Sequence, residues 1–152
     1  PPVIVNVTSL APVTPWPLSG GYAAAKAALS VATETLRMEL PDTHVIEVVP
    51  GPVDTPVQAE VRLIPGSARV LDKLPTGSAE RLARRIATAI ERDRTRVVFP
   101  RIYYPALALP TIGRRILRVL ARNVRTDDTV FRTGSQGDAA SIAARASWRP
   151  RR

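Results

Sequence analysis

The sequence predicts an α/β fold in which helices cover a mostly parallel sheet. Short β-branched runs alternate with longer stretches of helix-forming residues, which is typical of parallel strands joined by helical crossovers. A length of 152 residues with 45% hydrophobic content suits one globular domain. The chain has no cysteine, which excludes disulfides and thiolate chemistry and fits a reducing compartment such as the cytoplasm.

Three segments have the β-branched, apolar composition of buried strands. They are VIVNVTS (residues 3–9), HVIEVVP (44–50) and TRVVFP (95–100). Ligands of such sheets bind beyond the carboxyl ends of the strands. The first run ends at Thr8 and Ser9, and Pro50 and Gly51 close the second, so both strand ends are candidate site positions.

Two helices are expected between these strands. The first spans residues 22–40 and stops at Pro41. Its spacing predicts a buried face made of Ala25, Leu29, Ala32, Leu36 and Leu40. The second follows Ser78, a plausible N-cap, and its predicted core positions are Leu82, Ile86 and Ile90.

The first helix carries the candidate chemistry. Lys26 is one of only two lysines in a chain with 22 basic residues, and it lies one turn after Tyr22. Residues four apart share a helix face, and a neighbouring cation favours the ionised form of a phenol. Tyr22 is therefore a candidate proton carrier. The compact lysine ammonium can donate to several oxygens at once, unlike the planar arginine fork.

Other polar residues near these segments have simpler explanations. Ser19 lies in a Gly-rich approach loop, where hydroxyls usually serve turns or caps. His44 is the only histidine and has no clustered ligands in the sequence, so we expect no metal site. Trp16 could line a substrate pocket or simply pack, and Thr55 could cap a following helix as well as contact a ligand.

Three motifs in order, VNVTS (5–9), YAAAK (22–26) and PGPVDT (50–55), resemble the short-chain dehydrogenase/reductase family. The resemblance covers residues 3 to about 100. It implies the C-terminal half of a doubly wound parallel-sheet (Rossmann-like) domain, with the N-terminal cofactor-binding half absent. The family's glycine-rich turn would lie upstream of Pro1, so we expect this chain to be a piece of a longer protein and inactive alone.

The resemblance also implies roles for individual residues. Ser9 would polarise the substrate oxygen, Tyr22 would exchange its proton, and Lys26 would hold the nicotinamide ribose of NAD or NADP. The stretch after the second strand would contact the nicotinamide carboxamide through Pro50, Gly51, Val53 and Thr55. The implied function is an NAD(P)-dependent oxidoreductase that interconverts an alcohol and a carbonyl. A non-catalytic binding protein on the same fold is the alternative.

The segment 57–77 lies where the family places its variable substrate-binding region. Its apolar residues favour a hydrophobic alcohol or carbonyl substrate, although a connector packed on the sheet would use the same residue types: Val61, Leu63, Ile64, Val70, Leu71 and Leu74. A homo-oligomer is the expected state of the intact protein. The dehydrogenase domain is expected to span residues 1–109.

Residues 110–125 predict a basic amphipathic helix. One predicted face contains Ile112, Ile116, Val119, Leu120 and Asn123, and the opposite one Arg114, Arg118, Arg122 and Arg125. Docking of the helix on its own domain or on a sister subunit is favoured over contact with an anionic membrane surface as an adaptor. Residues 126–152 predict a disordered tail with a short helix near 138–146. The net charge of +9 is spread over the chain without a nucleic-acid-binding signature, so nucleic-acid binding is not expected.

Overall fold

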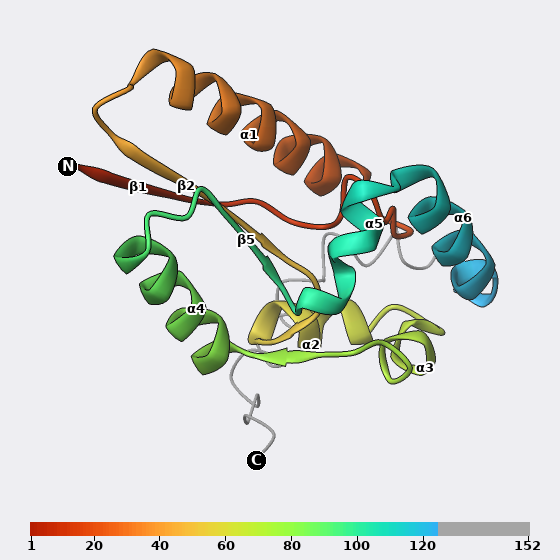
Figure 1. Ribbon diagram of the computed structural model, residues 1–152. Coiled ribbons are helices and arrows are strands. Elements are labelled where there is room, and N and C mark those ends of the chain that lie inside the picture. The colour runs from red at the N-terminus through yellow and green to blue at the C-terminus, as the bar shows by residue number, and fades with distance from the viewer. Residues whose placement is uncertain (125–152) are drawn as a thin grey trace.

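We describe residues 1–124 of a computed structural model, in which helices pack on both faces of a small parallel sheet (Figure 1). The order of elements is β1 (Val3–Val7), α1 (Gly20–Glu39), β2 (His44–Pro50), β3 (Val53–Asp54), α2 (Pro56–Arg62), α3 (Ser67–Leu71), β4 (Gly77–Ser78), α4 (Ala79–Glu91), β5 (Arg96–Phe99), η1 (Arg101–Tyr103), α5 (Tyr104–Ala108), α6 (Pro110–Leu120) and η2 (Ala121–Asn123). The expected tail at 126–152, with its helix near 138–146, lies outside the described residues.

The main sheet has the strand order β1-β2-β5 with parallel pairing throughout. The α/β class and the parallel sheet are thus confirmed, and the three strands lie where the sequence predicts them. β1 ends two residues earlier than expected, at Val7, and β5 covers Arg96–Phe99. All three strands run in one direction, so their carboxyl ends meet at one edge of the sheet.

The face of the sheet toward α4 is an apolar core. Its buried members are Ile46, Val48, Ala89 and Val97, with Val5, Leu82 and Ile86 packed against them. Ser78 caps α4 as predicted, because its Oγ accepts a hydrogen bond from Arg81 N at 3.3 Å. The expectation for Ile90 is wrong, since this residue is 41% exposed and Ala89 takes the core position beside it.

The other face of the sheet packs against α1, on the opposite side from α4 (Figure 1). The predicted buried face of α1 is wrong in part: Ala25 and Ala32 are exposed, Leu40 is 37% exposed, and Leu29 and Leu36 are half-buried. Thr33 is the helix's buried residue instead. The helix is rotated toward its polar residues because the sheet beneath it is polar as well, as described below.

The segment between β2 and α4 leaves the main sheet and returns to it, and its two ends pair with each other. β3 and β4 pair in parallel, with Val53 opposite Gly77, and Gly77 N donates to Pro52 O at 2.9 Å. Between them lie the short helices α2 and α3. Part of the predicted apolar set of 57–77 is buried here, namely Val70 and Leu71, whereas Leu63 is 57% exposed.

The C-terminal elements α5 and α6 lie at the carboxyl-end edge of the sheet (Figure 1). α6 packs through Leu117, which is buried, and through Gly113, where an added Cβ would lie 3.3 Å from Ala106 Cβ. The described part of the chain does not cover the predicted apolar face of α6, because Ile112, Ile116 and Val119 are 53%, 57% and 63% exposed. Docking of this face on a sister subunit stays a prediction. None of the helices in the described residues has the length and apolarity to cross a bilayer.

Candidate active site

The carboxyl-end edge of the sheet brings together the segments that carry the predicted site residues. Ser9 follows β1, and the next residue, Leu10, donates its N–H to Pro50 O at the end of β2 at 3.0 Å. Lys26 reaches the same place from α1, because its Nζ donates to Val7 O at 2.8 Å. The parallel strand ends and the first turns of α1 therefore share one rim.

Tyr22 and Lys26 lie on one face of α1, as their spacing predicts. Lys26 Nζ is 5.8 Å from the centroid of the Tyr22 ring, and the Tyr22 side chain is 49% exposed. An ammonium has three N–H donors. One is used on Val7 O, which fixes the position of the cation at the rim and leaves two N–H groups for a ligand.

The Ser9 hydroxyl is half-buried at the end of β1. Its Oγ accepts a hydrogen bond from Ala11 N at 3.1 Å, which leaves the hydroxyl proton available for donation. Thr8, immediately before it, is buried and fixed by Thr8 N donating to Val48 O at 2.8 Å. Ser9 is thus held by its neighbours' backbone hydrogen bonds.

Gly51 follows β2 at a tightly packed point of the rim. A Cβ added there would lie 2.9 Å from both Leu10 Cδ1 and Tyr103 Cδ2, so only glycine fits between these side chains. Tyr103 also donates its hydroxyl to Pro75 O at 2.9 Å. Burial raises the pKa of Tyr103 to about 12. This tyrosine ties the turn after β2 to the end of the 57–77 segment, and nothing in its sequence context indicated that role.

The remaining predicted cofactor contacts lie farther along the same turn. Val53 is buried in β3, and Thr55 is the N-cap residue of α2. Thr55 does not cap the helix through its side chain: its Oγ1 donates to Val53 O at 3.2 Å. The Thr55 side chain therefore stabilises the turn that leads into α2.

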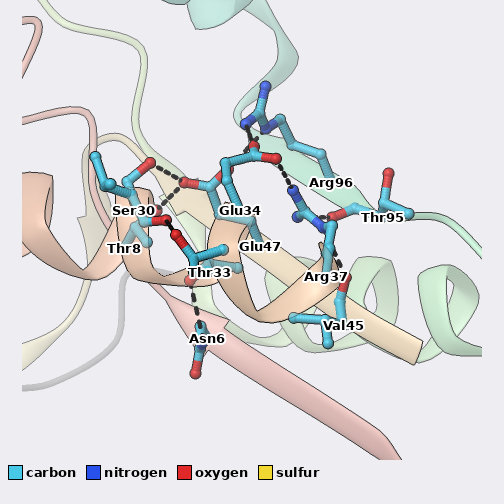
Figure 2. Close-up of polar contacts among 12 residues, drawn as sticks. Asn6, Thr8, Ser30, Thr33, Glu34, Arg37, Val45, Glu47, Thr95 and Arg96 are labelled. Atoms are coloured by element: carbon cyan, nitrogen blue, oxygen red, sulfur yellow. Dashed lines mark hydrogen bonds and ion pairs between the residues drawn. The ribbon is translucent and has the colours of Figure 1, made fainter. Parts of the chain in front are cut away.

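Beneath α1, a row of polar residues crosses the sheet. Asn6, Glu47 and Arg96 are register partners on β1, β2 and β5. Figure 2 shows that helix residues meet this row: Asn6 Nδ2 donates to Thr33 Oγ1 at 3.0 Å, and Ser30 Oγ donates to Glu47 Oε1 at 2.6 Å. The polar docking of α1 explains why its alanines point outward.

Glu47 is the centre of this network, with a side chain only 3% exposed. One carboxylate oxygen accepts from Ser30 on α1 and from Thr8 Oγ1 at 3.2 Å, and the other accepts from Arg96 Nε at 2.7 Å. Thr8 Oγ1 shares its single proton between Glu47 and Val48 O, which lies at 3.0 Å. Figure 2 shows the carboxylate between these partners. Glu47 therefore joins the residue before Ser9 to the helix that carries Tyr22 and Lys26.

The network continues to the outer end of α1. Arg96 also pairs with Glu34, and Glu34 pairs with Arg37 at 2.7 Å. Arg37 in turn donates to Val45 O at 3.1 Å and to Thr95 O at 2.6 Å (Figure 2). The hydrogen bond from Arg37, helped by the charges of Arg37 and Arg96, holds the pKa of Glu34 below 4.5 against the opposing effect of burial.

The structure also gives the contacts of His44, Ser19 and Trp16, the other residues considered from the sequence. His44 Nε2 lies 3.1 Å from Arg94 O and 3.4 Å from Asp93 Oδ1. Ser19 donates to Trp16 O at 2.7 Å, as expected of a turn hydroxyl. Trp16 itself has a buried indole Nε1 without a partner among residues 1–124. In the same part of the chain no three His, Cys, Asp or Glu side chains gather as metal ligands.

Comparisons with known proteins point to one enzyme class. Residues 2–64 match the family model described as short chain dehydrogenase, a range that contains every predicted site residue. A 3β-hydroxysteroid dehydrogenase 1 of Eggerthella lenta is 36% identical over 76 residues. This alignment covers 49% of the chain and 29% of the relative, so the chain spans less than a third of that protein's length in the match. No solved structure shows a significant match.

Together the two matches support an oxidoreductase of the short-chain dehydrogenase/reductase family. The family match ends at residue 64, and the described structure after this point continues the same sheet with β5.

Proposed function

We propose that this chain carries the catalytic part of an NAD(P)-dependent oxidoreductase that interconverts an apolar alcohol and its carbonyl. The observation that carries the proposal is the position of Lys26. Its ammonium is held at the rim by Val7 O, 5.8 Å from the Tyr22 ring, with two N–H donors left. Ser9 and the turn after β2 meet at the same rim.

The donor set fits the ribose end of a nicotinamide cofactor. Two remaining ammonium donors suit two sugar hydroxyls, and Lys26 is the residue we assign to them. Pro50, Gly51, Val53 and Thr55 are assigned to the carboxamide side, since they form the turn beyond β2. A bound nicotinamide supplies the hydride donor or acceptor.

The protein's own residues then bind the substrate and move the proton. Ser9 donates its free hydroxyl proton as a hydrogen bond to the substrate oxygen. In alcohol oxidation Tyr22 takes the hydroxyl proton, and in carbonyl reduction it returns one to the carbonyl oxygen. Lys26 favours the ionised phenol during the oxidation because it places a positive charge beside the ring.

Glu47 is included in the proposal as a positioning residue. It does not reach the rim itself. Its carboxylate connects Thr8, which precedes Ser9, with Ser30, one turn after Lys26 on α1. The strand end that carries Ser9 and the helix that carries Tyr22 and Lys26 are thus both hydrogen-bonded to one buried carboxylate. This shared partner fixes the spacing of Ser9 relative to Tyr22.

The proposed substrate is a bulky apolar alcohol or ketone. The segment 57–77 follows the turn after β3. Its apolar residues Val57 and Leu63 are 58% and 57% exposed. The similar Eggerthella lenta protein is named as a hydroxysteroid dehydrogenase. An apolar surface beside the rim supports the same substrate class here.

The adenosine and pyrophosphate ends of the cofactor are assigned to a segment outside residues 1–152. The sequence contains no G-x-G-x-x-G pattern or similar glycine-rich turn after a strand. Activity is accordingly proposed for the complete polypeptide that carries this chain, and not for residues 1–152 alone.

The test is a turnover assay of that complete polypeptide with NAD or NADP and a panel of apolar secondary alcohols that includes hydroxysteroids. Tyr22→Phe should lower kcat by about 10²–10⁴-fold while cofactor affinity stays near wild type. Tyr104→Phe, at an exposed tyrosine on α5, is the matched control and should leave kcat unchanged. Near-normal turnover by Tyr22→Phe would refute the proposed proton carrier.

A second variant, Lys26→Arg, tests whether the donor geometry of lysine is needed in addition to its charge. The charge is retained, but a planar fork cannot donate to Val7 O and to two sugar hydroxyls as the ammonium can. We expect weaker cofactor binding together with lower kcat. Cofactor binding without turnover on any substrate, in the wild type as well, would favour a non-catalytic binding protein on this fold.

A further inference from the structure

The C-terminal helix α6 has an exposed apolar surface that the described part of the chain does not cover. Ile112, Ile116 and Val119 are each more than half exposed, and Leu109, just before the helix, is 54% exposed. At 3.6 residues per turn these positions fall on one side of the helix. We name this surface the α6 stripe.

The α6 stripe is distinct from the side by which the helix is attached. Leu117 and Gly113 pack against the protein, and Gly113 lies against Ala106 of α5. Arg114 on a third side donates to Pro12 O at 3.2 Å. The helix is thus anchored to the body of the protein while its apolar stripe faces outward.

The charge around the stripe has one sign. Residues 101–124 contain five arginines and no aspartate or glutamate. Arg115 and Arg122, both exposed, lie along one side of the stripe, and Leu120 lies along the other. α1 also exposes Val31 and Met38, but Glu34 and Glu39 lie on that helix. Only α6, among the described helices, combines an exposed apolar stripe with neighbouring arginines and no acidic residue.

We propose that α6 lies on an anionic membrane surface. Its stripe would enter the boundary between headgroups and acyl chains, and Arg115 and Arg122 would contact the anionic headgroups. Interfacial helices gain stability from both terms, burial of the apolar face and attraction to anionic lipid. The exposed stripe and the arginines beside it match both terms, whereas a second protein copy would bring the arginines of two such surfaces together.

The position of α6 gives this contact a consequence for the rim. Pro12, which accepts the hydrogen bond of Arg114, belongs to the loop between Ser9 and Tyr22. Val13 of that loop packs with Leu107 of α5 around the buried Leu10. A protein seated on lipid through α6 therefore holds the loop beside the catalytic rim close to the membrane surface, where apolar substrates concentrate.

The experiment is cosedimentation of the complete polypeptide with vesicles of neutral phosphatidylcholine and of phosphatidylcholine with one quarter phosphatidylglycerol. We expect binding to the anionic vesicles that falls steeply as salt rises from about 50 to 500 mM, because the Debye length shortens to a few ångströms. Equal binding to both kinds of vesicle, or binding to neither, would overturn the proposal. The readout does not depend on turnover, so its failure is separable from failure of the proposed oxidoreductase activity.

Paired variants separate charge from apolar contact. Arg115→Gln with Arg122→Gln should weaken partitioning by roughly tenfold or more, whereas Arg84→Gln with Arg85→Gln removes the same charge from α4 and should have little effect. Ile116→Ser with Val119→Ser should abolish binding, whereas Val31→Ser with Met38→Ser should not. Equal losses within either pair would overturn the proposal.

Two further outcomes would assign the stripe to another occupant. A clear fall in melting temperature for Ile116→Ser with Val119→Ser would show that another part of the polypeptide covers it. A change from dimer to monomer by light scattering in the same variant would identify a second copy. Either result would overturn the membrane assignment.

Discussion

The two faces of the β1-β2-β5 sheet are built by opposite means. Toward α4 the central strand presents Ile46 and Val48, which are fully buried among aliphatic side chains. Toward α1 the same strand presents Glu47, buried to a similar degree but held by Thr8, Ser30 and Arg96. Adjacent residues of one strand therefore serve a dry apolar core and a charged network.

The difference teaches what each face contributes. Aliphatic packing is non-directional and stabilises the fold through the area it removes from water. A buried carboxylate contributes little net stability, because its desolvation offsets much of its interactions, but its partners have only one good geometry. We interpret the α4 face as the source of stability and the α1 face as the device that sets where Tyr22 and Lys26 stand.

The largest effect should come from the apolar face. Ile46→Ala removes a fully buried side chain and should lower the free energy of unfolding by roughly 2–5 kcal/mol. The loss should be the same at low and high salt, as measured by urea denaturation. Val31→Ala, at an exposed position of α1, is the control and should change stability little. A salt-dependent loss for Ile46→Ala would break the distinction between the faces.

The next effect concerns the carboxylate. Glu47→Gln should cost about 1–3 kcal/mol of stability, because Arg96 loses one of its two charged partners and one hydroxyl must rearrange. In the complete enzyme, kcat should fall while KM for the alcohol stays nearly constant, since the spacing of Ser9 and Tyr22 changes and substrate contacts do not.

Arg96→Gln is the matched control for Glu47. It removes the same ion pair but keeps the bridge from Thr8 to Ser30 through Glu47. Its kcat should therefore stay close to wild type even though stability falls. Equal losses of kcat in the two variants would show that Glu47 acts only through stability.

A smaller effect is expected where the α1 face becomes apolar, near the rim. Burial favours the neutral form of Tyr103, whose pKa is raised to about 12. The buried neutral phenol therefore contributes to the stability of the fold. This contribution is fully present below the ordinary tyrosine pKa of 10 and is lost as pH rises through 12. Tyr103→Phe should therefore reduce the fall in melting temperature that wild type shows between pH 10 and 12. Tyr104→Phe, whose side chain is exposed, should leave that fall unchanged.

The smallest effect belongs to the exposed end of the network. Because Arg37 and Arg96 lower the pKa of Glu34, its ion pairs stabilise the fold above pH 4.5, and the contribution is lost as pH falls through the lowered pKa. Glu34→Gln should cost about 0.2–1 kcal/mol at pH 7, as for other exposed pairs. The difference from wild type, measured by thermal melts, should shrink as pH falls below 4.5 and vanish once Glu34 is protonated in the folded protein. A difference that persists there would indicate a loss of packing instead.

The sequence was sufficient for the three strands of the main sheet and for the helices α1, α4 and α6, but it did not predict β3, β4, α2, α3 or α5. β-branched runs bounded by Pro, Gly and hydroxyl residues mark the strands, and parallel strands must end at the same edge. The spacing of Tyr22 and Lys26 on one helix face follows from helix geometry alone. The positions of Ser9 and Gly51 at that edge follow from the strand ends.

The orientation of the helices was harder to predict. Alanine is compatible with either side of a helix, so the alanines of α1 gave a false apolar face, and the true contact depended on the pairing of Asn6, Glu47 and Arg96 across three strands. One signal was available: Glu47 is a charged residue in the middle of HVIEVVP. The role of Tyr103 depends on contacts with Gly51 and Pro75, which lie far from it in the sequence.

The pairing of β3 with β4 makes the segment 57–77, to which we assigned the substrate contact in the proposed function, exchangeable. Its two ends, at Val53 and Gly77, are hydrogen-bonded neighbours, so the loop between them begins and ends at one point of the protein. A replacement of different length or composition could be grafted between these ends without changing the separation of β2 and α4. Gly77 would have to be retained, because an added Cβ would lie 2.1 Å from the Phe99 ring atom Cε1. Under the proposed function, exchange of this segment would change the substrate preference while the rim stayed unchanged.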